Sequence, residues 1–295
     1  MPTKPALGLI GLGLMGAPFA KRLVERGYRV TAYDVDAKKI THAGAAGAAP
    51  GASPAELAAA SDVVMLFVTD TKSVEKAVFG ESGVLAGAGN GKVLVDFSTT
   101  EVDATREMAA RLKREIGMGW VDAPVSGGPP AVAAGTLTVM AGGDDKDIAR
   151  VRPIMADVAG RFTHMGPVGA GQSAKLINQV LVGSQHALLA EAIRFAENLG
   201  LDPQRLPECL AGGYADSVML QKLLPRMAAR AFEPPAGFAR QLLKDLDMVL
   251  AMAKQTQTPL PITSEAGTLY RLLVARGHGM SDSTAILKLY DKPPI

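Results

Sequence analysis

A glycine-rich turn near the N-terminus constrains the fold of this chain more than any other feature. The turn reads Gly11-Leu12-Gly13-Leu14-Met15-Gly16, follows an apolar run over residues 7–10 and opens a helical pattern, as in G-x-G-x-x-G units. The first glycine permits the bend, the second lets the backbone approach a pyrophosphate, and the third lets the helix pack on the strand. The helix N-terminus favours negative charge. Residues 11–16 are therefore predicted to bind a dinucleotide; a glycine-rich turn without a ligand is the alternative.

Asp34 ends the second apolar run, residues 28–33, at the place where such units recognise a ribose. A carboxylate there accepts hydrogen bonds from both ribose hydroxyls and repels a 2′-phosphate. We therefore expect NAD as the cofactor in preference to NADP. Lys38 and Lys39, one helical turn later, weaken this preference, and a simple turn role for Asp34 is the alternative.

Apolar runs alternate with helical patterns up to about residue 165. This alternation predicts a parallel sheet covered by helices on both faces, that is, a Rossmann domain of the α/β class over residues 1–165. The predicted strands are residues 7–10, 28–33, 62–68, 92–97, 119–121, 136–141 and 161–164, and the predicted helices are residues 15–26, 55–60, 71–78, 102–115 and 145–159.

Two predicted strands end in hydroxyl residues. Phe67-Val68-Thr69-Asp70 and Phe97-Ser98-Thr99-Thr100 lie at the carboxyl ends of their strands, the edge at which open α/β sheets bind ligands. We expect Val68, Thr69 and Thr99 to line the cofactor. Capping of the following helices by the same hydroxyls is a compatible role.

The pattern changes after Gly166. A glycine-rich break at residues 167–171 leads into a long helical pattern over residues 174–199, about 39 Å at the usual rise per residue. Only helical patterns follow, at residues 203–211, 217–230, 239–255, 261–276 and 283–290. The prediction is an all-α domain over residues 166–295 for substrate binding and oligomerisation, joined to the first by the long helix.

Ser126-Gly127-Gly128 follows a predicted strand and forms a glycine-containing loop. A hydroxyl beside unhindered backbone amides is a suitable receptor for a small carboxylate. An ordinary Ser-Gly turn before a helix is the alternative.

Lys175 is placed by this pattern in the first turn of the long helix, where the positive end of the helix dipole disfavours a cation. The dipole and any burial ease the loss of its proton, as a general acid and base requires. Asn178 and Gln179 follow at i+3 and i+4 and share its face. The sequence thus predicts a proton-transfer lysine with two amides beside one substrate; a solvated surface lysine is the alternative.

Lys244 lies in the predicted helix 239–255, where its side chain is expected to reach the nicotinamide end of the cofactor. A surface ion pair with Asp247 at i+3 is the alternative.

The four histidines show no metal-ligand spacing with one another or with Cys209, so no metal is expected. Cys209 itself is expected to be a small buried hydrophobe.

Charge and hydropathy exclude several classes of partner. The net charge is +2 with the charges scattered, which disfavours nucleic acid, and no uninterrupted run of about 18 apolar residues predicts a membrane span. Glycines interrupt the apolar run after Lys4, which argues against a secretory signal. With a single cysteine, a cytoplasmic protein is expected.

Taken together, four motifs resemble, in order, those of the β-hydroxyacid dehydrogenase family, which includes 3-hydroxyisobutyrate dehydrogenases, tartronate semialdehyde (2-hydroxy-3-oxopropionate) reductases and glyoxylate and succinic semialdehyde reductases. The resemblance implies that Ser126, Gly127 and Gly128 hold the substrate carboxylate and that Lys175 transfers the hydroxyl proton. It also implies that Asn178 or Gln179 orders the substrate, that Lys244 contacts the cofactor, and that the chain forms a homodimer or homotetramer. The motifs are Gly11-x-Gly13-x-Met15-Gly16, Asp122-Ala-Pro-Val-Ser126-Gly127-Gly128, Gly169-Ala-Gly171-Gln-x-x-Lys175-x-x-Asn178 and Lys244-Asp245-Leu246.

The expected activity is NAD-dependent hydride transfer between nicotinamide and a small 3-hydroxy acid or its semialdehyde. Asn178-Gln179 looks more like the tartronate semialdehyde reductases than the paired asparagines of many hydroxyisobutyrate enzymes, and Phe238 stands one residue closer to Lys244 than the family's aromatic residue. The alternatives are an imine reductase, which by resemblance carries Asp or Tyr in place of Lys175, and a non-catalytic NAD-binding protein.

Overall fold

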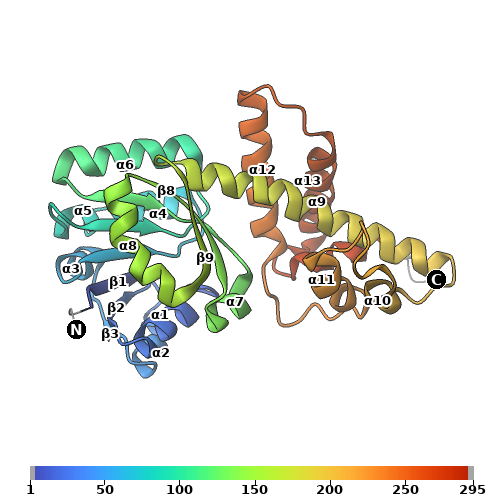
Figure 1. The fold of residues 1–295 in the computed structure, drawn as a ribbon, viewed down its shortest axis with the longest axis horizontal. Coiled ribbons are helices and arrows are strands. Elements are labelled where there is room, and N and C mark those ends of the chain that lie inside the picture. The colour runs from blue at the N-terminus through green and yellow to red at the C-terminus, as the bar shows by residue number, and fades with distance from the viewer. Residues whose placement is uncertain (1–3, 292–295) are drawn as a thin grey trace. The chain divides into compact units, whose positions relative to one another are not determined.

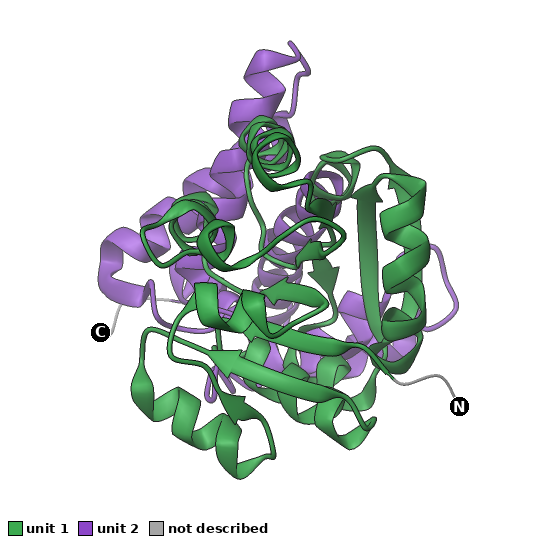
Figure 2. Cartoon of the chain, turned by 90° about the vertical axis from the view of Figure 1, so that its left-hand side faces the viewer, with its two compact units in different colours: residues 1–175 green, residues 176–295 purple. Residues whose placement is uncertain are grey.

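The computed structural model describes residues 4–291, and the chain divides into two compact units, residues 1–175 and 176–295 (Figure 2). The first unit contains a nine-stranded sheet, and helices make up the described part of the second. The sequence pattern placed the change of domain at residue 166, ahead of the long helix. The division between the compact units falls inside that helix, because its first turn packs against the sheet.

The sheet of the first unit has the strand order β3-β2-β1-β4-β5-β6-β8-β7, with β9 paired to β8 (Figure 1). The expected parallel arrangement is confirmed from β3 to β6. The sheet is not parallel throughout, because at one edge β8 runs antiparallel to β6 and β7. The short connection between β7 and β8 cannot make the crossover that a parallel pair needs. The strands are β1 Ala6–Ile10, β2 Arg29–Tyr33, β3 Ala49–Pro50, β4 Val63–Leu66, β5 Val93–Asp96, β6 Gly119–Asp122, β7 Val125–Ser126, β8 Leu137–Gly143 and β9 Ala159–Gly166.

Helices cover both faces of the sheet, as the continuous apolar strands β4 and β5 require. Side chains of α1, α2, α7 and α8 share one hydrophobic cluster with the sheet, and those of α3, α4, α5 and α6 share the other. The sequence pattern did not indicate α2 or α5, and a helix at the position of α7 appeared only in the alternative for Ser126–Gly128. In α2 only Ala43 is buried, so no apolar stripe marks the helix. These helices are α1 Gly16–Glu25, α2 Ala37–Ala45, α3 Pro54–Ala59, α4 Thr71–Phe79, α5 Val84–Gly87, α6 Val102–Ile116, α7 Gly128–Ala134 and α8 Asp145–Val158.

The long helix α9, Ala170–Asn198, begins earlier than its sequence pattern indicated. The Asp122 carboxylate at the end of β6 accepts hydrogen bonds from the backbone N–H groups of Gly169 and Gln172, both at 2.8 Å. These bonds satisfy donors at the helix N-terminus, so the glycine-rich segment starts the helix instead of breaking it. The placement of Lys175 in the first turn was therefore wrong, and it lies in the second.

The second unit packs helices around a cluster that includes Leu246, Tyr270 and Ile286. The predicted helix at residues 239–255 is confirmed in α12. Cys209 is exposed, so its expected burial was wrong: its helix is short, and it turns Leu206, Pro207 and Leu210 toward the interior instead. No helix within residues 4–291 has the length and apolar character of a membrane span. The remaining elements are η1 Pro203–Arg205, α10 Leu206–Leu210, α11 Val218–Ala228, α12 Ala239–Gln255, α13 Pro261–Leu273, the π-helical η2 Val274–His278 and the 3₁₀-helical η3 Ser283–Tyr290.

Candidate active site

The glycine-rich loop between β1 and α1 contains two glycines that the fold itself requires. Gly11 has a positive φ of 96°, and a Cβ on Gly11 or Gly16 would collide with the carbonyl oxygen of Phe67 or of Gly11, respectively. A Cβ on Gly13, in contrast, would meet no atom of the chain within 4 Å. The space beside Gly13 is thus open to a ligand.

The N-terminus of α1 suits an anion. No side chain caps this end of the helix, and its first turn has no acidic residue. The N–H groups that an α-helix leaves unpaired at its start, together with the helix dipole, favour a phosphate there. The open space beside Gly13 and the uncapped helix end together fit the pyrophosphate of a dinucleotide.

Asp34 follows β2 and holds the glycine-rich loop in place. Its Oδ2 accepts a hydrogen bond from the backbone N–H of Leu12 at 2.7 Å, and its Oδ1 accepts one from Asp36 at 2.9 Å. Lys39 Nζ lies 3.5 Å from Oδ1. The sequence analysis named Lys38 and Lys39 as residues that weaken the preference for NAD. Of these two, Lys39 contacts the Asp34 carboxylate.

The ends of β4 and β5 lie next to each other because these strands are paired. The backbone N–H of Val68 donates to Ser98 Oγ at 3.0 Å, which joins the two strand ends. The Thr69 hydroxyl lies 3.1 Å from Ser73 Oγ, beside the Asp70 carboxylate that caps α4. Thr69 thus belongs to the group of side chains that caps α4. The sequence analysis gave helix capping as a role compatible with lining the cofactor. Thr99 follows Ser98 in the second loop and is partly exposed.

The Lys175 side chain reaches from α9 to the loop that follows β6. Its Nζ donates a hydrogen bond to the carbonyl oxygen of Val125 at 2.9 Å, and the residue is only 8% exposed. Val125 directly precedes Ser126, so the amine lies beside the hydroxyl-glycine segment Ser126–Gly128. The structure therefore brings together Lys175 and the segment Ser126–Gly128, for which the sequence separately predicted proton transfer and carboxylate binding.

Sequence reasoning missed two buried residues that fix the start of α9. Asp122 was noted only as part of a motif, yet its carboxylate accepts the two hydrogen bonds described above. Gln172 donates from Nε2 to the Ser98 carbonyl at 2.8 Å and accepts at Oε1 from the Thr100 N–H at 3.2 Å. Their hydrogen bonds tie the turn before Lys175 to the ends of β6 and β5.

The charge on Asp122 predicts a pH dependence of stability. Burial raises the pKa of the Asp122 carboxyl from 3.8 to about 7, against the opposing effect of the hydrogen bonds from Gly169 and Gln172. The folded protein therefore holds this proton more tightly than the unfolded chain does. The resulting contribution to stability is complete below about pH 4 and is lost as the pH rises through about 7.

The measurement is the free energy of unfolding by denaturant at a series of pH values, for the wild type and for Asp122→Asn, which does not titrate. We expect the wild-type value, relative to that of the variant, to decrease between about pH 4 and pH 7. A difference that is constant over this range would contradict the shifted carboxyl.

In the second unit, Asn178 and Gln179 of α9 and Asp245 of α12 form a hydrogen-bonded chain. Asn178 Nδ2 donates to Gln179 Oε1 at 2.8 Å, and Gln179 Nε2 donates to Asp245 Oδ2 at 2.6 Å. Both ends of the Gln179 amide are thus engaged within the unit, and the residue is buried. Asn178 is partly exposed and is the more accessible of the two amides.

Lys244 pairs with its neighbour Asp245, with Nζ 3.1 Å from Oδ1. Asp247, the partner of Lys244 in the alternative, accepts a hydrogen bond from Arg271 at 2.6 Å. The sequence pattern of charges at i and i+3 did not show this competing arginine from α13.

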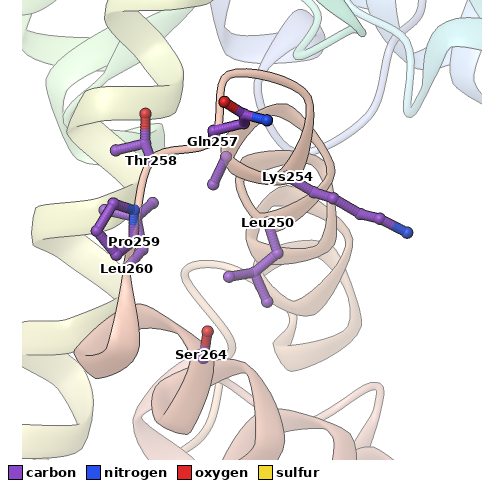
Figure 3. A pocket seen from close by; sticks show the side chains of 8 residues that line it. Leu250, Lys254, Gln257, Thr258, Pro259, Leu260 and Ser264 are labelled. Carbon is purple, nitrogen blue, oxygen red and sulfur yellow. The ribbon is translucent and has the colours of Figure 1, made fainter.

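A groove of about 490 Å³ lies between the C-terminal end of α12 and the start of α13 (Figure 3). None of its lining residues belongs to the predicted site. Within residues 4–291, no group of three or more His, Cys, Asp or Glu side chains is arranged to hold a metal. The groove is lined by Leu250, Ala253, Lys254, Gln257, Thr258, Pro259, Leu260 and Ser264.

Two family models match the chain. Residues 6–166 match the NAD binding domain of 6-phosphogluconate dehydrogenase, and residues 169–290 match the NAD-binding domain of NADP-dependent 3-hydroxyisobutyrate dehydrogenase. Together these matches extend over almost all of the described residues.

Similar proteins match over nearly their whole length. The 2-hydroxy-3-oxopropionate reductase of Escherichia coli is 35% identical over 96% of this chain and 96% of its own. A probable mitochondrial 3-hydroxyisobutyrate dehydrogenase-like protein of Arabidopsis thaliana is 37% identical over 94% of this chain and 91% of its own. The structure of Mycobacterium tuberculosis 3-hydroxyisobutyrate dehydrogenase with L-serine superposes with a TM-score of 0.87, at 31% identity over 98% of this chain and 100% of that one.

Proposed function

Because the chain belongs to the β-hydroxyacid dehydrogenase family, we propose that it interconverts a small 3-hydroxy acid and its semialdehyde with NAD as the cofactor. The observation that carries this proposal is the hydrogen bond from Lys175 Nζ to the Val125 carbonyl at 2.9 Å. It holds a nearly buried amine beside the segment Ser126–Gly128. A proton-transfer group and a receptor for a small acid are thus neighbours within one unit.

In the proposed mechanism the Ser126 hydroxyl and the backbone N–H groups of Gly127 and Gly128 bind the substrate carboxylate. This anchor orients the acid, which favours short acids over neutral alcohols. Lys175 exchanges the proton of the reacting oxygen: as ammonium it donates to the aldehyde oxygen, and as amine it accepts from the hydroxyl. A nicotinamide cofactor, when bound, would supply the hydride for reduction or take it in oxidation. Asn178, one turn beyond Lys175 in α9, orders the substrate.

The preference for NAD rests on Asp34. Its buried carboxylate lies at the end of β2 beside the glycine-rich loop, where it would repel a 2′-phosphate. The open space beside Gly13 takes the pyrophosphate, and Val68, Thr69 and Thr99 line the cofactor from the neighbouring strand ends. Lys244, whose side chain is 29% exposed, is assigned to the nicotinamide end.

Replacing Ser126 tests the carboxylate receptor. We expect Ser126→Ala to raise KM for the acid about tenfold with a smaller change in kcat, since one hydrogen bond to a charged group is lost. Initial rates at saturating cofactor give both constants. The matched control is Ser264→Ala, an exposed serine of the groove in Figure 3, which should leave both unchanged. An unchanged KM in Ser126→Ala would remove this residue from the receptor.

The experiment that tests the function is a substrate panel followed by NADH absorbance. The panel contains tartronate semialdehyde, methylmalonate semialdehyde, glyoxylate, succinic semialdehyde and their hydroxy acids, with NADPH in parallel. We expect turnover of at least one short acid, faster with NADH than with NADPH. Turnover of none of these compounds would favour one of the alternatives, an imine reductase or a non-catalytic NAD-binding protein.

We further propose a homodimer or homotetramer formed through the second unit, in the cytoplasm. Four large apolar side chains of α9 are at least half exposed and follow one another at spacings of four, seven and seven residues, as in helices that pack against a partner helix. The single cysteine suits a reducing compartment. Light scattering after gel filtration measures the oligomer, and a monomer at micromolar concentration would contradict it. The side chains are Ile177, Leu181, Leu188 and Phe195.

A further inference from the structure

A chain of buried polar groups leads from α12 to the accessible amide of α9. Asp245 is 8% exposed and Gln179 is 5% exposed, whereas Asn178 is partly exposed. The two hydrogen bonds, at 2.6 Å and 2.8 Å, run in sequence from Asp245 through Gln179 to Asn178. All three residues lie in the second unit, so this arrangement is independent of the first.

The Asp245 carboxylate stands at one end of this series of hydrogen bonds. It determines which atom donates and which accepts in each of them. Lys244 Nζ lies 3.1 Å from Asp245 Oδ1, so this carboxylate is the anionic partner of an ammonium group. An ionised carboxylate accepts hydrogen bonds and cannot donate them. Gln179 must therefore turn its Nε2 toward Asp245, since its Oε1 in that place would put two acceptors face to face.

The orientation of Gln179 then fixes that of Asn178. With Nε2 bound to Asp245, the acceptor Oε1 faces Asn178, which must offer its Nδ2. The Oδ1 of Asn178 is consequently turned away from Gln179. An isolated asparagine can exchange its oxygen and nitrogen by a rotation about χ2, but here that exchange would break the bond to Gln179.

We infer that Asp245 is a positioning residue that sets the polarity of the Asn178 amide, so that Asn178 offers its carbonyl oxygen to a hydroxyl group of the substrate. This inference rests on the proposed function, in which Asn178 orders a hydroxy acid. It assigns Asp245 a role apart from its ion pair with Lys244. It also explains why a buried glutamine, which has no free polar atom, stands next to Asn178.

Exchanging the carboxylate of Asp245 and the amide of Gln179, first singly and then together, tests whether they set the orientation of the Asn178 amide. In Asp245→Asn the carboxylate becomes an amide, which can meet either end of Gln179, so both orientations of Asn178 become populated. We expect KM for the hydroxy acid to rise about tenfold, with the Kd of NADH unchanged. In Gln179→Glu two carboxylates face each other, and a larger rise in KM is expected.

The double variant Asp245→Asn/Gln179→Glu restores the hydrogen bond in which Asn178 Nδ2 donates to the side chain at position 179. The new carboxylate at position 179 accepts from the new amide at position 245 and from Asn178 Nδ2. We therefore expect KM to return to within about threefold of the wild type. A merely structural role for Asp245 predicts no such recovery, and a double variant as impaired as the worse single variant would overturn the inference. The control is Asp247→Asn, which removes an exposed carboxylate of the same helix and should leave KM unchanged.

A second readout needs no turnover. The side-chain amide protons of Asn178 are followed by NMR in the wild type and the three variants, with Asn178→Ala used to assign them. The proton bonded to Gln179 should be shifted downfield in the wild type, less so in Asp245→Asn, and again fully in the double variant. An unshifted signal in all of them would refute the polarity. Failure of the wild type on the substrate panel would instead refute the proposed function.

Discussion

Replacement of Lys175 by alanine should lower kcat by roughly a hundredfold to ten-thousandfold and leave the Kd of NADH nearly unchanged. General acid–base catalysis by a positioned group contributes roughly 10²–10⁴ in rate, and this amine is the group that the fold holds beside the proposed carboxylate receptor. Lys175→Arg should be equally inactive, because a guanidinium keeps its proton and does not serve as the base. Steady-state rates and fluorescence titration of NADH measure the two effects.

The matched control is Lys254→Ala, which removes a lysine of α12 at the edge of the groove in Figure 3. It should keep wild-type turnover. Two results would contradict the role of Lys175: loss of NADH affinity in Lys175→Ala, which would make the lysine a cofactor ligand, or turnover that survives the substitution.

The second large effect is expected at Gly13. A Cβ there would meet no heavy atom within 4 Å beyond the adjacent residues, so we expect Gly13→Val to fold with a Tm close to that of the wild type. The same side chain occupies the space through which the pyrophosphate approaches the backbone. We expect the Kd of NADH to rise at least about a hundredfold, measured by fluorescence titration or calorimetry.

Gly16→Ala is the informative comparison. Its Cβ would collide with the Gly11 carbonyl oxygen, so this smaller substitution should lower Tm, whereas Gly13→Val should not. If Gly13→Val bound NADH as the wild type does, the dinucleotide would have to lie elsewhere.

Much of the fold could be predicted because its elements bury regular apolar patterns. The continuous apolar strands β4 and β5 identify a sheet covered on both faces, and α12 was predicted with its observed bounds. The start of α9 could not be predicted in this way. Its cap is Asp122, about 50 residues away in the sequence, and a local pattern does not report so distant a partner.

In the candidate site, too, the residues of local motifs could be predicted from the sequence, whereas residues that act through distant partners could not. The glycine-rich loop, Ser126–Gly128 and Lys175 each belong to a local motif whose chemistry can be reasoned from the residues. Gln172 and Asp245 both stand in motifs quoted in the sequence analysis, but their partners lie 66 to 74 residues away, and the local sequence does not identify those partners. Their roles follow only from the fold, which buries them and pairs each with a specific group.

The claim on which this account depends is that one small acid contacts both Lys175 and Ser126 beside the cofactor. The most direct test is a crystal structure of the enzyme with NAD and the hydroxy acid that the panel identifies. We predict Lys175 Nζ within hydrogen-bond distance of the substrate hydroxyl and Ser126 Oγ within the same distance of its carboxylate, roughly 2.6–3.2 Å in each case. A bound acid that leaves Lys175 directed to solvent, or that lies away from Ser126, would contradict the account.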